Sequence, residues 1–370
     1  MATPYLLLLL LMLCWLQLSL AKETSFWSSI HALEARSTSH SSHPPHPLRR
    51  DTPTPAGHTS VKCTRPVARV SFYALTPAEQ SAWIHHFHLL HTPGRSIFIK
   101  GGSYMDDLVM VHIGLQEEMH YNACFLVCHT AFLRAFYTLM RVTGYRGREA
   151  YWDIEHDWRH GMQNSPLWRL FGGDDGRGGA IPNGPFRNLR CGVLPNTKKP
   201  GYSLVKPHYV TRHFNSNWLH KPLSRGDMYT HAYNTSLYNQ ILTAPTYTKL
   251  RTLLETSLHA WTHQSIGGEM WLYSSPCEPT FWLLHAEVDR CWRSWQLRTG
   301  KYFEYGGHKR IRKVGASAGA TVIKEASLED TVDFYGLFEK VKVADVMHPR
   351  RGIMCFRYDR LLGGELDTGG

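Results

Sequence analysis

Charged residues are scarce in this chain. They make up only 19% of its 370 residues, whereas 43% of the residues are hydrophobic and 12% are aromatic. A chain of this composition has enough apolar side chains to bury a sizeable core, so it cannot be disordered along its whole length. The sequence also lacks internal repeats, and we find no linker after the N-terminal region. One large domain is therefore the simplest interpretation.

Acidic residues are scarcer than basic ones. The chain has 30 Asp and Glu against 41 Lys and Arg, which gives a formal net charge of +11. A basic balance alone can indicate a nucleic-acid partner or an anionic surface. However, the basic residues are scattered, zinc-finger spacing is absent, and no basic motif alternates with aromatic residues. We therefore expect no nucleic-acid partner.

Long hydrophobic runs are absent except at the N-terminus. Tyr5 through Leu20 is almost wholly apolar but shorter than the roughly 20 residues that span a bilayer. It ends in Ser19-Leu20-Ala21, a small-x-small pattern that signal peptidases accept. An uncleaved membrane anchor is the alternative. The sequence predicts a signal peptide over residues 1–21, a secreted protein, and no membrane contact after cleavage.

The next segment lacks large apolar side chains. Ser37–Pro55 consists mostly of Ser, His, Pro and Thr, which cannot form a core. Residues 22–62 are therefore predicted to be a disordered linker or pro-segment. The pair Arg49-Arg50 is either a processing site or two solvated arginines. The composition becomes globular at Cys63, which places a single domain at residues 63–370.

Cysteine is infrequent, and its number is odd after signal cleavage. Cys14 lies in the predicted signal peptide, which leaves seven of the eight cysteines. In an oxidising compartment at least one of these stays unpaired or pairs between chains, and the spacing fixes no connectivity. Cys124 and Cys128 are either a reactive thiol pair or two small buried residues. Two surface features are also predicted, a long loop over Gly172–Gly184 and a glycosylation sequon at Asn234-Thr235-Ser236.

Helical periodicity occurs in four segments, and each segment places histidine in its apolar stripe. The histidines are His112 in a helix from about Asp106, His129 in one from about Phe125, His259 and His263 in one through Leu250, and His285 in one from Glu278. One such histidine is more often a core residue that is hydrogen-bonded to a carbonyl. Four helices with this property indicate a metal site in the core of a bundle.

His259 and His263 form the strongest local motif. At i, i+4 spacing both imidazoles project from one helical face and can chelate one ion. Zinc hydrolases use the same spacing, but their motif has a Glu directly after the first His. Here that position is Ala260. Imidazole ligands without a carboxylate suit copper as well as zinc.

These residues resemble the copper signatures of the tyrosinase family. Glu278–Trp292 is similar to the family's Asp-Pro-x-Phe-x-x-His-His-Ala-x-x-Asp-Arg-x-Trp, and Leu258–Gly268 to its Leu-His-Asn-x-x-His-x-x-Ile-Gly-Gly. Asp107–Leu133 is similar to the first copper site, and Tyr151-Trp152-Asp153 follows as in the family. The resemblance extends over most of Cys63–Tyr358 and is closest to short secreted fungal tyrosinase-like proteins.

The resemblance implies a mainly α fold, in which a four-helix bundle with long irregular loops holds a dinuclear, type 3 copper site. Two copper ions would be held by six neutral imidazoles, so binding should weaken at acid pH. The implied ligands are His112, His120 and His129 for the first copper, and His259, His263 and His285 for the second. His120 precedes His129 by nine residues, or two and a half turns, so we expect it on the loop that enters the second helix.

The implied activity is oxidation of a phenolic small molecule to an o-quinone with dioxygen, in a pigment or secondary-metabolite pathway. Glu255, one turn before His259, is the candidate catalytic base. Asp289 and Arg290 are expected to form an ion pair near the site, and Leu272 lies where the family often has a gate residue.

Several positions depart from the family pattern. Ala260 replaces the Asn after the first ligand of the second site, Leu284 replaces a His, Thr130 replaces an Arg, and Glu118 replaces a Cys that some fungal members link to the second histidine. Changes around metal ligands typically cost 10–100-fold in affinity or activity. Two alternatives therefore stay open: a catalytically weak copper and dioxygen-binding protein, and a basic secreted binding protein without copper.

Overall fold

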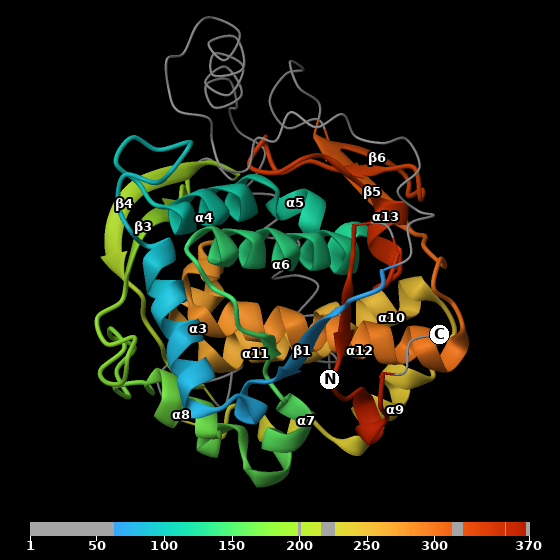
Figure 1. Ribbon diagram of the computed structural model, residues 1–370, viewed down its shortest axis with the longest axis horizontal. Helices are drawn as coiled ribbons and strands as arrows, with labels where there is room; N and C mark the ends of the chain where they lie inside the picture. The colour runs from blue at the N-terminus through green and yellow to red at the C-terminus, as the bar shows by residue number, and fades with distance from the viewer. Residues whose placement is uncertain (1–62, 199–200, 216–225, 313–320, 352, 368–370) are drawn as a thin grey trace, which may run out of the picture.

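The computed structural model describes residues 63–198, 201–215, 226–312, 321–351 and 353–367. The predicted signal peptide, the linker and the Arg49-Arg50 pair lie outside the described residues. Within them the fold is mainly helical, as expected (Figure 1). No helix in these ranges combines the length and the apolar character needed to cross a membrane.

Helices account for most of the regular structure. The α-helices are α3 (Pro77–Leu90), α4 (Tyr104–Gly114), α5 (Gln116–Met119), α6 (Cys124–Val142), α7 (Ile154–Asp157), α8 (Pro166–Phe171), α9 (Thr235–Leu242), α10 (Tyr247–Leu254), α11 (Ala260–Ile266), α12 (Pro279–Thr299) and α13 (Val343–Met347). A π-helical turn, η6 (Glu255–His259), joins α10 to α11. Short 3₁₀ turns are η2 (Phe72–Ala74), η3 (Trp158–His160), η4 (Met162–Asn164), η5 (Thr230–Ala232), η7 (Gly268–Trp271), η8 (Ser275–Cys277) and η9 (Leu362–Gly364).

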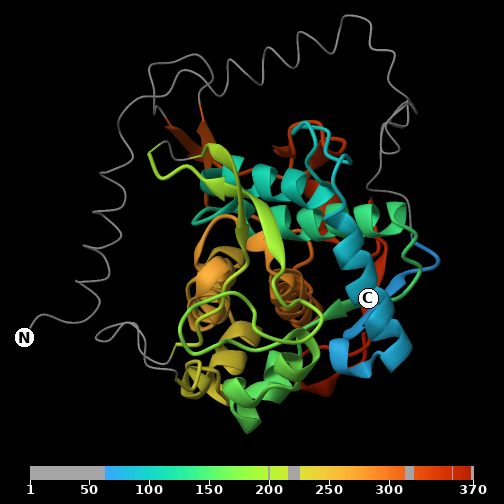
Figure 2. The same ribbon diagram turned by 90° about the vertical axis from the view of Figure 1, so that its left-hand side faces the viewer.

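Within the described ranges the strands form one small parallel sheet and three hairpins. The sheet has the order β2-β1-β9, with β1 (Val67–Ser71) between β2 (Glu149–Tyr151) and β9 (Phe356–Tyr358). The antiparallel hairpins are β3 (Arg190–Pro195) with β4 (Ser203–Tyr209), β5 (His308–Arg312) with β6 (Thr321–Glu325), and β7 (Thr331–Val332) with β8 (Val341–Lys342). Figure 2 views the molecule from the side on which β3 and β4 lie. The sheet thus joins the beginning of the domain to its end.

Local signals set the ends of the helices that matter for the site. α4 begins with a capping box, in which Ser103 and Asp106 each bond the other's backbone N–H. α12 has Glu278 as its N-cap and Pro279 at its first position, and it ends at Gly300 in the left-handed conformation. α6 has no capping side chain at Ala123; instead the side-chain oxygen of Asn122 accepts a hydrogen bond from the backbone N–H of Cys124.

The core extends through the described domain, and α6 and α12 pack against one another within it. The rings of Phe136 and Trp282 stack 4.0 Å apart at this contact. In Figure 1, α4, α5 and α6 lie above α11 and α12. Because α6 and α12 are almost completely buried along the segments that face each other, side chains at their contact are held in a dry environment.

Two disulfides among the described residues tie distant parts of the domain together, and a third is local to α6. They join Cys63 to Cys355, Cys124 to Cys128 and Cys191 to Cys277, and Cys291 is buried and free. The expectation of at least one unpaired cysteine is confirmed. Cys124 and Cys128 are buried, as one interpretation had it, but they are not a reactive thiol pair, because they are bonded to one another across the first turn of α6.

The two predicted surface features are held in place by hydrogen bonds. The Gly172–Gly184 loop is anchored inward, since Arg212 donates to the carbonyl of Gly172 and Asp174 accepts from the backbone N–H of Phe214. The sequon residue Asn234 is the N-cap of α9, and its side-chain oxygen accepts a 3.0 Å hydrogen bond from the backbone N–H of Leu237. Asn234 is thus part of a helix terminus.

Candidate metal centre

Six histidines gather in two groups in the interior. In each group one ring nitrogen of every histidine lies within 4.8 Å of the corresponding atoms of the other two. The first group, or first triad, is His112, His120 and His129, and the second triad is His259, His263 and His285. Five of the six side chains are at most 8% exposed, and His263 is partly buried. The structure therefore brings together all six histidines singled out in the sequence.

The first triad comes from three consecutive elements. His112 lies in the last turn of α4, and His129 lies in the second turn of α6. His120 follows α5 directly, with extended backbone angles (φ −121°, ψ 149°). The prediction that His120 lies on the segment entering the second helix is confirmed. An extended residue at this point lets the side chain turn back to the histidines on both helices.

The second triad is built around a π-helical turn. The backbone N–H of Ala260 donates to the carbonyl of Glu255, five residues earlier, and this bond lies within the segment that carries His259. His263 follows one turn later on α11, and His285 faces them from α12. The rings of His259 and His263 are 4.5 Å apart, and those of His259 and His285 are 5.1 Å apart. Single π-turns occur often at functional sites, because they shift side chains out of the α-helical register.

Backbone carbonyls fix the tautomer of five histidines. The Nδ1 atoms of His112, His120, His129, His259 and His263 pair with the carbonyls of Tyr273, Gln116, Phe125, Glu255 and Met270 at 2.6–3.2 Å. A carbonyl can only accept, so Nδ1 carries the proton in each case. The lone pair of each neutral ring is therefore on Nε2, where it can bind a metal.

The atoms that would bind the metal have no protein partner. Among the described residues, the buried Nε2 atoms of His112, His129, His259 and His263, and both ring nitrogens of His285, make no hydrogen bond. A buried polar atom without a partner costs about 1–3 kcal/mol. A cluster of such atoms, all of them imidazole nitrogens, is explained by metal coordination, and imidazole is a good ligand for copper. The residues present therefore fit a pair of copper ions.

Burial keeps these rings neutral. It lowers the pKa of His112, His129, His259 and His285 well below the usual value, and the neighbouring imidazoles lower it further. The pKa values of His120 and His263 fall to about 4 for the same main reason. Neutral imidazole is the form that coordinates a metal, so no proton has to be displaced at neutral pH.

The two triads are joined at several points. The rings of His129 and His285 stack 4.2 Å apart with an angle of 4° between their planes. Glu255 links the second triad to the neighbour of the first: its carbonyl accepts from His259, and its carboxylate accepts from the backbone N–H of Tyr121, next to His120. The rings of Phe125 and Phe281 lie against the histidines, with centroids 4.9 Å from His129 and 4.3 Å from His285.

Glu255, the candidate base, is 2% exposed and has both carboxylate oxygens engaged. One accepts from the backbone N–H of Tyr121 at 2.5 Å, and the other accepts from Arg251 at 2.9 Å. Burial raises the pKa of Glu255 to about 7, although these two donors oppose the shift. Ala260, the residue after His259, is partly buried, and Leu272 is 39% exposed.

The expected ion pair between Asp289 and Arg290 is absent from the described structure. Neighbouring residues on a helix point about 100° apart, so their side chains do not meet. Asp289 instead pairs with Arg69 at 2.8 Å and with Arg293 at 3.1 Å, while Arg290 pairs with Glu287 at 2.6 Å. Sequence reasoning missed Arg69 because it lies on β1, 220 residues before Asp289.

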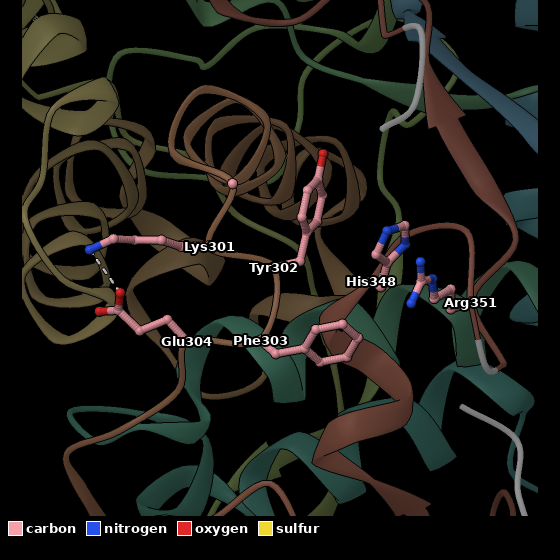
Figure 3. Close-up of a pocket in the computed structure, with 7 residues that line it drawn as sticks. Lys301, Tyr302, Phe303, Glu304, His348 and Arg351 are labelled. Carbon is pink, nitrogen blue, oxygen red and sulfur yellow. Dashed lines mark ion pairs between the residues drawn. The ribbon is translucent and has the colours of Figure 1, made fainter. Parts of the chain in front are cut away.

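Two other features of the described residues are separate from the triads. Cys191, His208 and Glu269 lie close enough to hold a metal, but the sulfur of Cys191 is bonded to Cys277. A surface hollow of about 470 Å³ lies at the C-terminal end of α12, lined by Gly300, Lys301, Tyr302, Phe303, Glu304, His348 and Arg351 (Figure 3). Gly300 is about 20 Å along the helix from His285 at 1.5 Å per residue. The hollow is therefore not the opening of the histidine cluster.

Comparison with known proteins gives consistent matches. The family model "Common central domain of tyrosinase" matches residues 102–298, a range that contains all six histidines. A tyrosinase-like protein of Diaporthe leptostromiformis is 29% identical over 80% of this chain and 81% of its own length. An N-acetyl-6-hydroxytryptophan oxidase of Emericella nidulans is 26% identical over 79% of this chain and 92% of its own.

A solved structure supports the fold. A variant of the polyphenol oxidase from Thermothelomyces thermophila superposes with a TM-score of 0.63 at 23% identity, covering 80% of this chain and 90% of that one. At 23% identity this similarity supports the fold alone.

Proposed function

Because the chain belongs to the tyrosinase family of type 3 copper oxidases, whose members use two copper ions, we propose that it oxidises a small o-diphenol to an o-quinone. The overall reaction consumes two diphenols and one dioxygen and yields two quinones and two waters. The observation that carries the proposal is the pair of buried triads, in which Nδ1 is bound to a carbonyl and Nε2 is left for a metal.

The proposed ligands are the six histidines of the two triads. His112, His120 and His129 hold the first copper, and His259, His263 and His285 hold the second. The copper pair supplies the redox chemistry with dioxygen that these side chains cannot perform alone. The protein's part is to keep the rings neutral, fixed in orientation and dry. The carbonyls that bind Nδ1 fix the orientation, and the aromatic walls of Phe125 and Phe281 exclude water.

The substrate we propose is phenolic. One relative is called an oxidase of a 6-hydroxytryptophan derivative, whose hydroxyl group lies on the benzene ring of the indole and is therefore phenolic. Another relative is called tyrosinase-like. His263 is only partly buried, and Leu272, two residues after the carbonyl of Met270 that binds His263, is 39% exposed. We propose that a small phenol approaches at this point. We propose that the product feeds a pigment or secondary-metabolite pathway.

We further propose that diphenols are preferred over monophenols. A monophenol has an ordinary pKa of about 10, so it must transfer its proton to a base before its oxygen can bind copper. Glu255 is the proposed base, but both of its oxygens already accept hydrogen bonds. The side chain of Ala260 has no polar atom that could hold a water between Glu255 and the substrate. A diphenol needs less help, because its first pKa is lower and it has two oxygens.

The compartment we propose is extracellular. Three disulfides within the described residues favour an oxidising compartment, since they rarely persist in a reducing cytosol. The signal sequence over residues 1–21 and the sequon at Asn234 agree with this proposal. N-terminal sequencing of protein from the culture medium tests it, with Lys22 or a residue after Arg50 as the expected start. Protein found inside the cell with Met1 intact would contradict it.

A second candidate function is copper and dioxygen binding without useful catalysis. The engaged carboxylate of Glu255 and the absence of a polar side chain at Ala260 favour it, because both leave the phenol proton without an obvious acceptor. The two functions differ in turnover. Copper content and dioxygen consumption should therefore be measured on the same purified protein with catechol as the probe.

The expected result is two coppers per chain and quinone formation coupled to dioxygen uptake. Two coppers without quinone would favour the second candidate. A protein that stays without copper after loading would overturn both and leave a basic binding protein. His263→Ala serves as the control that removes one proposed ligand and must abolish turnover.

A further inference from the structure

One short loop orients a histidine of each triad. The segment Glu269–Ser274, here called the carbonyl loop, presents two backbone carbonyls three residues apart. The carbonyl of Met270 accepts from Nδ1 of His263 at 2.6 Å, and the carbonyl of Tyr273 accepts from Nδ1 of His112 at 2.7 Å. A shift of this loop would therefore disturb both triads at once.

Glu269 closes the carbonyl loop on itself. Its carboxylate, which is 1% exposed, accepts a hydrogen bond from the hydroxyl of Ser274 at the other end of the loop. Its backbone carbonyl accepts from the N–H of Leu272 at 3.0 Å. The second carboxylate oxygen lies 2.9 Å from Nε2 of His208 on β4. One side chain thus fixes both ends of the loop and ties them to the β3–β4 hairpin.

The loop is also anchored before and after Glu269. The backbone N–H of Glu269 donates to the carbonyl of Thr211 at 2.9 Å. Gly268 has a φ of +53°, and a Cβ at this position would lie 2.1 Å from the same carbonyl, so only glycine fits. After the loop, the disulfide of Cys277 with Cys191 ties η8 to β3, where Cys191 is the register partner of His208.

A buried carboxylate at this point needs an explanation. Removing a carboxylate from water is unfavourable, and its partners must offset this cost. The titratable partner of Glu269 is His208: burial lowers the pKa of His208, but the hydrogen bond and charge of Glu269 outweigh this and raise it above its usual value. Charge-assisted hydrogen bonds are shorter and about twice as strong as neutral ones, so they hold a loop more rigidly.

We propose that Glu269 is a positioning residue for both copper sites, and that it acts by fixing the two carbonyls that orient His112 and His263. The proposal rests on the ligands proposed above. Glu269 touches no ligand itself, so its effect passes through the backbone of Met270 and Tyr273. Removal of its carboxylate should therefore weaken copper binding at both sites, whereas loss of a single ligand weakens one.

The test compares Glu269→Ala with Asp157→Ala. Asp157 is also a buried carboxylate, 1% exposed and bonded to Tyr73, Trp152 and Ser165, but it contacts no residue of the triads or the carbonyl loop. Both variants should lose stability. Only Glu269→Ala should release copper to a competing chelator at 10–100-fold lower chelator concentration. Glu269→Gln keeps an oxygen for Ser274 and should restore most of the resistance.

The assignment to both sites is tested in single-copper backgrounds. His263→Ala keeps copper only at the first triad, and His112→Ala keeps it only at the second. Adding Glu269→Ala to either background should weaken the remaining copper by a similar factor. If Glu269→Ala does not fold, Ser274→Ala breaks the same closing bond with a smaller change and should give the same pattern to a lesser extent.

Three outcomes would overturn the proposal. Unchanged chelator resistance in Glu269→Ala would show that the carboxylate is only structural. A loss in one background alone would show that it serves one site. Wild-type protein that binds no copper would remove both this proposal and the proposed function, whereas the first two outcomes leave the proposed function intact.

Discussion

The hydroxyl of Thr130 donates a 2.7 Å hydrogen bond to the carboxylate of Asp289. Thr130 follows His129 on α6, and Asp289 lies one turn after His285 on α12, so the bond fastens the two helices beside the stacked rings. The other oxygen of Asp289 accepts from Arg69 on β1 at 2.8 Å. Arg69 also pairs with Glu149 at 2.8 Å. A buried cluster of charges therefore supports the region where the triads meet.

Arg69→Met should destabilise the domain strongly. The side chain of Arg69 is 2% exposed, and its removal leaves the buried carboxylates of Asp289 and Glu149 without their shared cation. Breaking such a buried pair costs about 3–5 kcal/mol. Urea unfolding monitored by tryptophan fluorescence would measure the change. The control is Arg148→Gln, which loses a solvated pair with Glu79 and an exposed hydrogen bond to the carbonyl of Ala74, and should unfold almost like the wild type. Equal midpoints for both variants would contradict this prediction.

His263→Ala should lower the copper content from two ions per chain to one. His263 supplies one of three ring nitrogens in the second triad and contributes nothing to the first. Elemental analysis after dialysis against a weak chelator measures the content. His348→Ala is the matched control, because His348 is also buried but belongs to neither triad. Full copper content in His263→Ala would refute the assignment of this ligand.

Ala260→Asn should raise the rate on a monophenol relative to the rate on a matched diphenol. The amide can hold a water near His259 and Glu255, which gives the phenol proton a path to a base. We expect an increase of roughly 10-fold or more in the ratio, in the usual range for general base catalysis. The wild type and Ala260→Asn must both be assayed with full copper content. A wild type that already uses the two substrates equally well, or an unchanged ratio in the variant, would contradict the prediction.

His348 should make the domain less stable as the pH falls from about 6.5 to 4. Burial and the nearby Arg351 lower the pKa of His348 to about 4, and its Nδ1 accepts from the backbone N–H of Arg350. The unfolded chain, with an ordinary pKa near 6.5, takes up the proton first, so stability present above pH 6.5 is lost on acidification. In His348→Phe, which keeps a ring against Tyr302, we expect the free energy of unfolding to fall by roughly 2 kcal/mol less over this pH range than in the wild type. The comparison uses copper-free protein, and parallel stability curves would contradict it.

Asn234 allows capping and glycosylation to be separated. Asn234→Ala removes the acceptor for the N–H of Leu237 at the start of α9 and should cost about 1 kcal/mol. Asn234→Asp keeps this acceptor and should cost much less. Both variants abolish the sequon, so the secreted protein should lose the same glycan mass in each. Masses that differ between wild type and variants only by the substituted residue would show that the site is not used.

The helices that carry the triads could be predicted because large apolar side chains recur along their sequences with the helical period. Phe125, Phe132 and Phe136 mark the inward face of α6, and His129 follows the same rhythm. The position of His120 could be predicted from its separation from His129. A residue nine positions earlier on a straight helix does not lie on the same face. In each case the information is local, within a few turns of one helix.

Other parts of the site could not be predicted, because they depend on residues distant in sequence. Nothing near Asp289 identifies Arg69 as its partner. The π-turn before Ala260 changes which carbonyl accepts a hydrogen bond, but a single turn of five residues is too short for its shift in register to be recognised in the sequence. The carbonyls of Met270 and Tyr273 come from the backbone, so the amino-acid types do not reveal them. The pairing of the cysteines likewise depended on the fold.

The parallel sheet implies a particular order of events during biosynthesis. β1 lies near the start of the domain, and its neighbour β9 lies near the end, where Cys355 bonds to Cys63 across 292 residues. A ribosome adding about 5–20 residues per second needs about 15–60 s for that distance. During this interval Cys63 can meet every cysteine of the nascent chain except its correct partner. We therefore expect the yield of active protein to depend on disulfide isomerases, and the Cys63–Cys355 bond to form last.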